Sequence, residues 1–144
     1  MKISLALRLG ALLILSVGTF EVVSADQVST RKIRVQVLHL NDIYEIASVN
    51  GGREGGLARV ATIQKQLRKE NSNLITTLGG DFLSPSALGL AKYKGKRLAG
   101  MQMVNVLNKI GLDYATFGNH EFDLKENQFF ARLAESEFSW ISSN

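Results

Sequence analysis

The stretch GNHEFD, residues Gly118 to Asp123, follows directly on the apolar segment 112–117. It places an amide, an imidazole and two carboxylates on one turn at the end of a predicted β-strand. Amide and carboxylate oxygens are ligands of hard divalent cations, and a neighbouring imidazole can exchange protons near neutral pH. The stretch therefore indicates a metal-dependent chemical site at the carboxyl end of a strand.

Two further apolar runs end in a residue of the same kind. Asp42 follows the run 33–40, and Asp81 follows the run 74–78 after two glycines. If these runs are parallel strands, their carboxyl ends meet at one edge of a sheet, which is where open α/β sheets place their sites. We therefore expect Asp42, Asp81 and Asn119 to converge there.

Helical patterns alternate with these strands. Apolar residues recur at helical spacing over residues 57–70 and again over 98–110. Asp123, with Glu126 three residues later, is typical of the cap that begins a further helix. Residues 138–141 then begin a fourth strand. This alternation predicts an α/β layered domain.

The N-terminus has the features of a secretory signal peptide over residues 1–25. Lys2 and Arg8 flank its start, residues 9–20 are uncharged and mostly apolar, and residues 23–25 supply small side chains for cleavage. We therefore expect export to a periplasmic or extracellular location. The alternative is an uncleaved anchor, although the apolar run is shorter than the about 20 residues that span a bilayer. No second long apolar stretch exists, so no stable membrane anchor is expected after cleavage.

Composition narrows the function classes. The chain has 17 basic and 13 acidic residues, a formal net charge of +4 and no cysteine. Without residues 1–25 the net charge is only +3, and this balance argues against a nucleic-acid partner, because a nucleic-acid module would concentrate Lys and Arg on one face or along one helix. Without cysteines there are no disulfides, so stability depends on a core, on metal or on additional chain.

Four segments together resemble a known family. They are LHLND at 38–42, GGLAR at 55–59, GGDFLSPS at 79–86, and the block 105–123 that ends in GNHEFD. Because these four segments occur in the order found in the family, the chain resembles the N-terminal part of the 5′-nucleotidase branch of the calcineurin-like metallophosphoesterases. The resemblance implies a four-layer α/β/β/α sandwich, of which residues 26–144 would be an incomplete N-terminal part. It also implies hydrolysis of phosphate esters, with nucleotide phosphomonoesters as the expected substrates.

The same resemblance implies roles for five residues. Asp42 would hold one metal ion, Asp81 would bridge two ions, and Asn119 would bind the second. His120 and Asp123 would form a catalytic dyad, and metal-activated water would be the nucleophile. The cofactors would thus be two divalent metal ions, with Mn, Zn, Mg and Ca all open.

The chain departs from the family pattern in its histidines. The family has Asp-x-His where this chain has Tyr44 two residues after Asp42; the tyrosine would either bind metal as a phenolate or only pack. His39 and His120 are the only histidines, and the family takes further histidine ligands from strands downstream. The sequence is therefore interpreted as a fragment whose partner would be the missing C-terminal half of the domain. The alternatives are a non-catalytic half-domain, or a relative acting on cyclic nucleotides, nucleotide sugars or a sulfur-bound substrate.

Other polar features have simpler interpretations. His39 lies on an apolar strand, where a structural histidine is the more common case. Glu121 is expected to cap or solvate its turn rather than to bind metal. Residues 84–97 are predicted to be a looser segment, and the four basic residues between positions 92 and 97 are expected to form a solvated surface.

Overall fold

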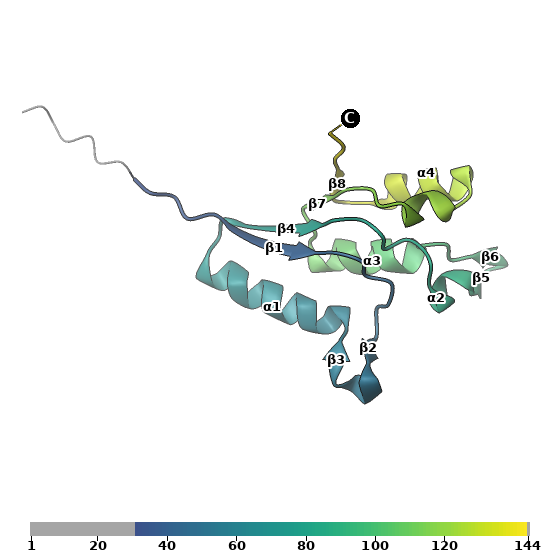
Figure 1. Cartoon of the computed structure of the whole chain (residues 1–144), viewed down its shortest axis with the longest axis horizontal. Helices are drawn as coiled ribbons and strands as arrows, with labels where there is room; N and C mark the ends of the chain where they lie inside the picture. The colour runs from purple at the N-terminus through teal and green to yellow at the C-terminus, as the bar shows by residue number, and fades with distance from the viewer. Residues whose placement is uncertain (1–30, 144) are drawn as a thin grey trace, which may run out of the picture. The chain divides into compact units, whose positions relative to one another are not determined.

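The computed structural model describes residues 31–143 (Figure 1). Contacts divide the chain into residues 1–32 and residues 33–144, and the second unit contains every helix and strand described below. The signal peptide predicted for residues 1–25 lies outside the described residues. Within residues 31–143, no helix combines the length and the apolar character that crossing a bilayer requires.

The centre of the fold is a four-stranded parallel sheet in the order β1-β4-β7-β8. These strands are β1 (Gln36–Leu40), β4 (Leu74–Leu78), β7 (Tyr114–Ala115) and β8 (Ser139–Trp140). β4 has the predicted bounds, while β1, β7 and β8 are shorter than the apolar runs that contain them. The prediction of an α/β domain is confirmed, and the strands are parallel, as convergence of the three strand ends requires.

Three main helices follow the strands. α1 (Leu57–Glu70) and α3 (Met101–Ile110) lie along the same side of the sheet, and α4 (Glu126–Glu135) packs against α3 (Figure 1). Gly111 ends α3 in the left-handed conformation, with φ of 80°. This ending matches the usual role of glycine after a helix, because glycine has no Cβ to oppose positive φ.

The core lies between the sheet and the helices. Its fully buried side chains come from α1, β4, the loop after β4, and α3: Leu57, Leu78, Phe82, Leu83, Met103, Val104 and Leu107. On α3, Met103, Val104 and Leu107 are fully buried, whereas Met101 is only half-buried.

The segment 84–97 is more ordered than predicted. It contains the short helix α2 (Ala87–Leu90) and a hairpin of β5 (Lys92–Tyr93) and β6 (Lys96–Arg97). Both residues of the hairpin turn have positive φ, which is the backbone geometry of a tight two-residue connection. A second small hairpin pairs β2 (Ser48–Val49) with β3 (Glu54–Gly55) across the short 3-10 helix η1 (Asn50–Gly52).

The predicted cap of α4 is wrong. Asp123 belongs to the 3-10 turn η2 (His120–Asp123), and the residue that precedes α4 is Lys125. The side-chain oxygen of Gln128 accepts a hydrogen bond from the Lys125 backbone N–H at 3.2 Å. The Asp123 carboxylate instead pairs with His120 through Oδ2.

Candidate functional site

The loops after β1, β4 and β7 meet at the carboxyl edge of the sheet. The Asp42 N–H donates to the Gly80 carbonyl at 3.3 Å, and the His120 N–H donates to Asp81 Oδ1 at 2.9 Å. These two bonds join the first loop to the second and the second to the third. The structure thus brings Asp42, Asp81 and the Asn119–His120 peptide together, as expected from the ends of parallel strands.

Both aspartates have a left-handed backbone. The φ angles are 53° for Asp42 and 57° for Asp81. This conformation is unfavourable for a residue with a Cβ, and it persists where the surrounding structure over-determines the backbone. Such residues are concentrated at functional sites. Asn50, Lys94 and Ala99 also have positive φ, so the two aspartate angles agree with a functional role for these loops without singling them out.

The second and third loops touch at two glycines. A Cβ built on Gly80, whose φ is 100°, would lie 2.3 Å from the Gly118 backbone nitrogen. A Cβ on Gly118 would lie 2.1 Å from Asp81 Oδ1. The glycines of GGD and GNHEFD therefore serve a joint purpose: they let the two loops approach closely enough for Asp81 to meet the His120 N–H.

Gly80→Ala is expected to destabilise the fold by about 3 kcal/mol or more, because it combines an unfavourable φ with a backbone clash. The matched control is Gly95→Ala in the β5–β6 turn, where φ is also positive, at 79°, and open space surrounds the added Cβ. The control should cost only about 1–2 kcal/mol. Urea unfolding of the two variants measures the difference, and equal costs would contradict a close approach of the loops.

The Asp42 carboxylate is held by two neighbouring side chains. The Asn41 side-chain amide donates to Asp42 Oδ2, and the Tyr44 hydroxyl donates to Asp42 Oδ1 at 3.2 Å. The same hydroxyl lies 3.5 Å from Asp81 Oδ2, a long contact. Desolvation first, and then the Asp42 and Asp81 carboxylates, raise the pKa of Tyr44 from 10.0 to about 12.

Tyr44 does more than pack in this structure, because its hydroxyl donates a hydrogen bond to Asp42. A phenol with a pKa of about 12 is neutral and donates a hydrogen bond at physiological pH. It connects the two carboxylates, and its ring contacts the His120 ring edge-on with centroids 5.9 Å apart. The tyrosine is thus part of the site by contact.

His120 and Asp123 form the expected pair. His120 Nδ1 lies 2.7 Å from Asp123 Oδ2, and the two side chains are 34 % and 50 % exposed. The hydrogen bond to Asp123 is the main reason that the pKa of His120 lies above its ordinary value of 6.5, while partial burial acts in the opposite direction. The pair leaves Nε2 as the ring nitrogen not engaged by Asp123.

Glu121 is the residue whose role the sequence interpretation missed. It was expected to cap or solvate its own turn, but its side chain is fully buried, with an exposure of 0 %. Its carboxylate accepts four backbone N–H bonds, from the GNHEFD loop and from the loop after β4: Gly118 at 2.7 Å, Asp81 at 2.8 Å, Phe82 at 2.8 Å and Leu83 at 3.1 Å. Only the bond from Gly118 joins residues that are close in the sequence. The sequence could therefore indicate only that Glu121 caps its own turn.

Asn119 lies between two anchored residues. Glu121 holds Gly118 on one side of it, and Asp81 holds His120 on the other. Its backbone carbonyl accepts from the Phe122 N–H at 3.2 Å. Within residues 31–143, no hydrogen bond engages its side-chain amide, so the amide oxygen is available to a ligand.

His39 is not part of this set. Its Nδ1 lies 2.8 Å from Thr77 Oγ1 on the neighbouring strand β4. The expectation of a structural histidine with a hydrogen-bond partner agrees with this contact. Its cross-strand bond lies within the sheet rather than in the loops that hold the two aspartates.

The side-chain oxygens of Asp42, Asp81 and Asn119 show whether this group of residues suits a divalent metal ion. Two carboxylates and one amide are hard oxygen donors of the kind that Mg²⁺, Mn²⁺ and Ca²⁺ accept. In the part of the chain that the structure describes, no three His, Asp or Glu side chains are grouped to hold a metal ion. Asp42, Asp81 and Asn119 therefore fit part of a metal site, and two complete coordination spheres require further donors.

Comparison with known proteins shows similarity to 5′-nucleotidases. The chain is 31% identical to the 5′-nucleotidase of Bos taurus and 30% identical to that of Homo sapiens, over 96% and 98% of its own length. It is also 30% identical to the snake venom 5′-nucleotidase of Gloydius brevicauda over 77% of its length. These matches cover 24%, 23% and 19% of the relatives, so the chain spans about a fifth to a quarter of their length.

Solved structures share the fold. The calcineurin-like phosphoesterase YfkN from Bacillus subtilis matches with a TM-score of 0.59 at 22% identity, over 74% of this chain and 36% of that one. A putative 5′-nucleotidase from Staphylococcus aureus matches with a TM-score of 0.62 at 20% identity, over 75% and 22% of the two chains. The family model for calcineurin-like phosphoesterases matches residues 35–144, which include all three loops of the site. The chain belongs to the calcineurin-like phosphoesterase family.

Proposed function

We propose that this chain carries part of the active site of a divalent-metal-dependent phosphoester hydrolase, with nucleotide phosphomonoesters as substrates. The observation that carries the proposal is the His120 N–H bond to Asp81, because it places the His120–Asp123 pair beside the candidate metal carboxylates. Relatives that are 5′-nucleotidases support the choice of nucleotides. Family membership supports phosphoester hydrolysis, and the family generally uses divalent metal ions.

Asp42 would hold one ion, Asp81 would bridge two, and Asn119 would bind the second. Bound divalent ions would polarise the phosphoryl oxygens and supply hydroxide at neutral pH. The chain's own contribution is to position these ligands. Asn41 and Tyr44 orient the Asp42 carboxylate, and the His120 N–H orients Asp81.

His120 would act on the leaving group. Nδ1 is occupied by Asp123, so Nε2 is the atom that can donate a proton to the leaving oxygen. The bond to Asp123 favours the imidazolium, which is the form that can donate. After the transfer, the remaining proton stays on Nδ1, and the hydrogen bond to Asp123 keeps the ring in place.

Asp81→Asn tests the metal part of the proposal. The variant keeps the side-chain shape but removes the charge that would bridge two ions, so Mn²⁺ affinity should fall by about tenfold to a hundredfold. Mn²⁺ titration of the 144-residue chain, followed by calorimetry and by the rise in Tm, measures this. The control is Asp113→Asn, because Asp113 binds Arg68 and the Thr76 N–H away from the site. Equal Mn²⁺ binding by wild type and Asp81→Asn would contradict the assignment.

Export is proposed as well. The support is the pattern of residues 1–25, with basic residues at the start, an apolar run and small residues at its end. Two similar proteins are named as snake venom 5′-nucleotidases. The mass of the polypeptide recovered from the exported fraction of its source cells tests this, since cleavage after Ala25 removes those residues.

A further inference from the structure

One hydroxyl reaches both aspartates of the candidate site. The Tyr44 hydroxyl donates to Asp42 Oδ1 at 3.2 Å and lies 3.5 Å from Asp81 Oδ2. The two carboxylates come from different loops, one after β1 and one after β4, so this hydroxyl links the two loops. The Tyr44 ring also contacts the His120 ring edge-on, with centroids 5.9 Å apart, and this contact helps to hold the hydroxyl in place.

The other oxygen of each carboxylate also faces a donor of the chain. Asp42 Oδ2 accepts a hydrogen bond from the side-chain amide of Asn41. Asp81 Oδ1 accepts one from the His120 backbone N–H at 2.9 Å. All four carboxylate oxygens therefore face an N–H or an O–H group. These donors supply part of the positive charge that a bound cation would supply.

The Tyr44 hydroxyl is an easily displaced donor. Its hydrogen turns about the C–O bond, whereas the His120 N–H is fixed in the backbone of an anchored loop. The hydroxyl carries one proton, which it donates to Asp42, so its longer contact with Asp81 lacks a good hydrogen bond. Two carboxylates that share one neutral donor still repel each other, and a divalent cation offsets this repulsion more strongly than a phenol does.

We propose that the Tyr44 hydroxyl competes with a divalent cation for the Asp42 and Asp81 carboxylates. The hydroxyl holds the two carboxylates in the metal-free protein, and a cation that binds them displaces its hydrogen bond. Tyr44 therefore lowers the affinity of the site for a metal ion without being one of the ligands. This proposal rests on the proposed function, because it takes Asp42 and Asp81 as metal ligands, and it adds a residue that sets how tightly they bind.

Tyr44→Phe removes the hydroxyl and keeps the ring. In calorimetric titration of the 144-residue protein, Mn²⁺ should bind the variant about threefold to tenfold more tightly than wild type, because no hydrogen bond to Asp42 has to be broken. Without metal, the Tm of the variant should be lower by roughly 2–4 °C, since the carboxylates lose their shared donor. At saturating Mn²⁺ the two Tm values should become equal, because neither metal-bound protein has this hydrogen bond.

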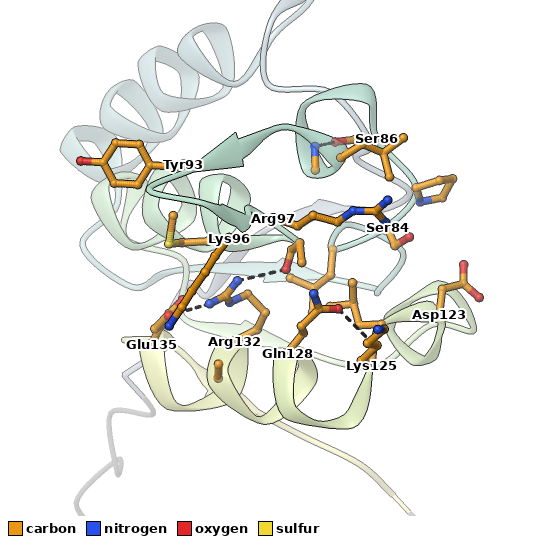
Figure 2. Close-up of a pocket in the computed structure, with 18 of the residues that line it drawn as sticks. Ser84, Ser86, Tyr93, Lys96, Arg97, Asp123, Lys125, Gln128, Arg132 and Glu135 are labelled. Carbon is orange, nitrogen blue, oxygen red and sulfur yellow. Dashed lines mark hydrogen bonds and ion pairs between the residues drawn. The ribbon is translucent and has the colours of Figure 1, made fainter.

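The matched control is Tyr93→Phe, which removes the same atom from an exposed tyrosine outside the three loops of the site. Tyr93 lies on the β5–β6 hairpin, beside the cleft between this hairpin and α4 that Lys96, Arg97 and Lys125 line (Figure 2). This variant should change Mn²⁺ affinity by less than about twofold, and its Tm should stay within about 2 °C of wild type at every Mn²⁺ concentration.

Three results would overturn the proposal, and each has a different meaning. Weaker Mn²⁺ binding by Tyr44→Phe would make the phenol oxygen a metal ligand. Equal Mn²⁺ binding, with the same difference in Tm at every Mn²⁺ concentration, would make the hydrogen bond purely structural. Absence of Mn²⁺ binding by both wild type and Tyr44→Phe would contradict the metal dependence in the proposed function, and the competition would be refuted with it.

Discussion

Glu121→Gln is expected to destabilise the fold by about 2–4 kcal/mol, because it leaves buried N–H groups without acceptors. Glu121 Oε1 accepts from Phe82 and Leu83, and Oε2 accepts from Asp81 and Gly118. A glutamine has the same shape but replaces one oxygen by an NH₂ donor. Whichever way the amide is turned, two backbone N–H groups then face a donor.

Urea unfolding and the thermal midpoint measure this effect, and the Tm should fall by roughly 8 °C or more for a domain of this size. The control is Glu126→Gln, an exposed residue at the start of α4. It should change stability by no more than about 0.5 kcal/mol. Amide hydrogen exchange provides a local readout, since Asp81, Phe82, Leu83 and Gly118 should lose protection in Glu121→Gln alone. Unchanged protection at these four amides would contradict the role of the carboxylate.

His120→Ala is expected to lower turnover of phosphate esters by about 10²–10⁴-fold while Mn²⁺ affinity is retained. The physical reason is that Nε2 would donate the proton to the leaving group, whereas the candidate metal ligands lie on Asp42, Asp81 and Asn119. Because this chain holds only part of the metal site, kcat on a nucleotide monophosphate is measured with the full-length protein, together with Mn²⁺ titration of the same protein.

His39→Ala is the matched control for this variant. It removes the other histidine of the chain, which is bonded to Thr77 within the sheet. Its kcat should remain within a few-fold of the wild-type value, because a group outside the site affects the reaction only through stability. Turnover that is unchanged in His120→Ala, or lost equally in both variants, would contradict the role of His120.

Much of the architecture was predictable from local patterns. The spacing of apolar residues predicted β4 and α1 with their observed bounds, and Gly111 predicted the end of α3. Parallel strands followed by Asp42, Asp81 and Asn119 were enough to predict that these three loops meet at one edge of the sheet. Helical and strand periodicity, together with glycine at a helix end, are properties of adjacent residues, so a sequence displays them directly.

Two local segments were interpreted wrongly from the sequence. Asp123 had the spacing of a helix cap, but its carboxylate binds His120, and the cap lies two residues later. The hairpin at 92–97 lacks the strong apolar alternation of a strand, so it was interpreted as a loose segment. In both cases local propensity was overridden by contacts formed in the folded chain.

The sequence by itself determined the class of fold and the edge of the sheet at which Asp42, Asp81 and Asn119 come together. Only the tertiary structure decided that Glu121 binds amides about 40 positions earlier, that Tyr44 joins two carboxylates, and that the hairpin and α4 enclose a basic cleft. The physical reason is that such contacts depend on strand order and on how closely loops approach. The periodicity of a single segment encodes neither the strand order nor the distance between loops.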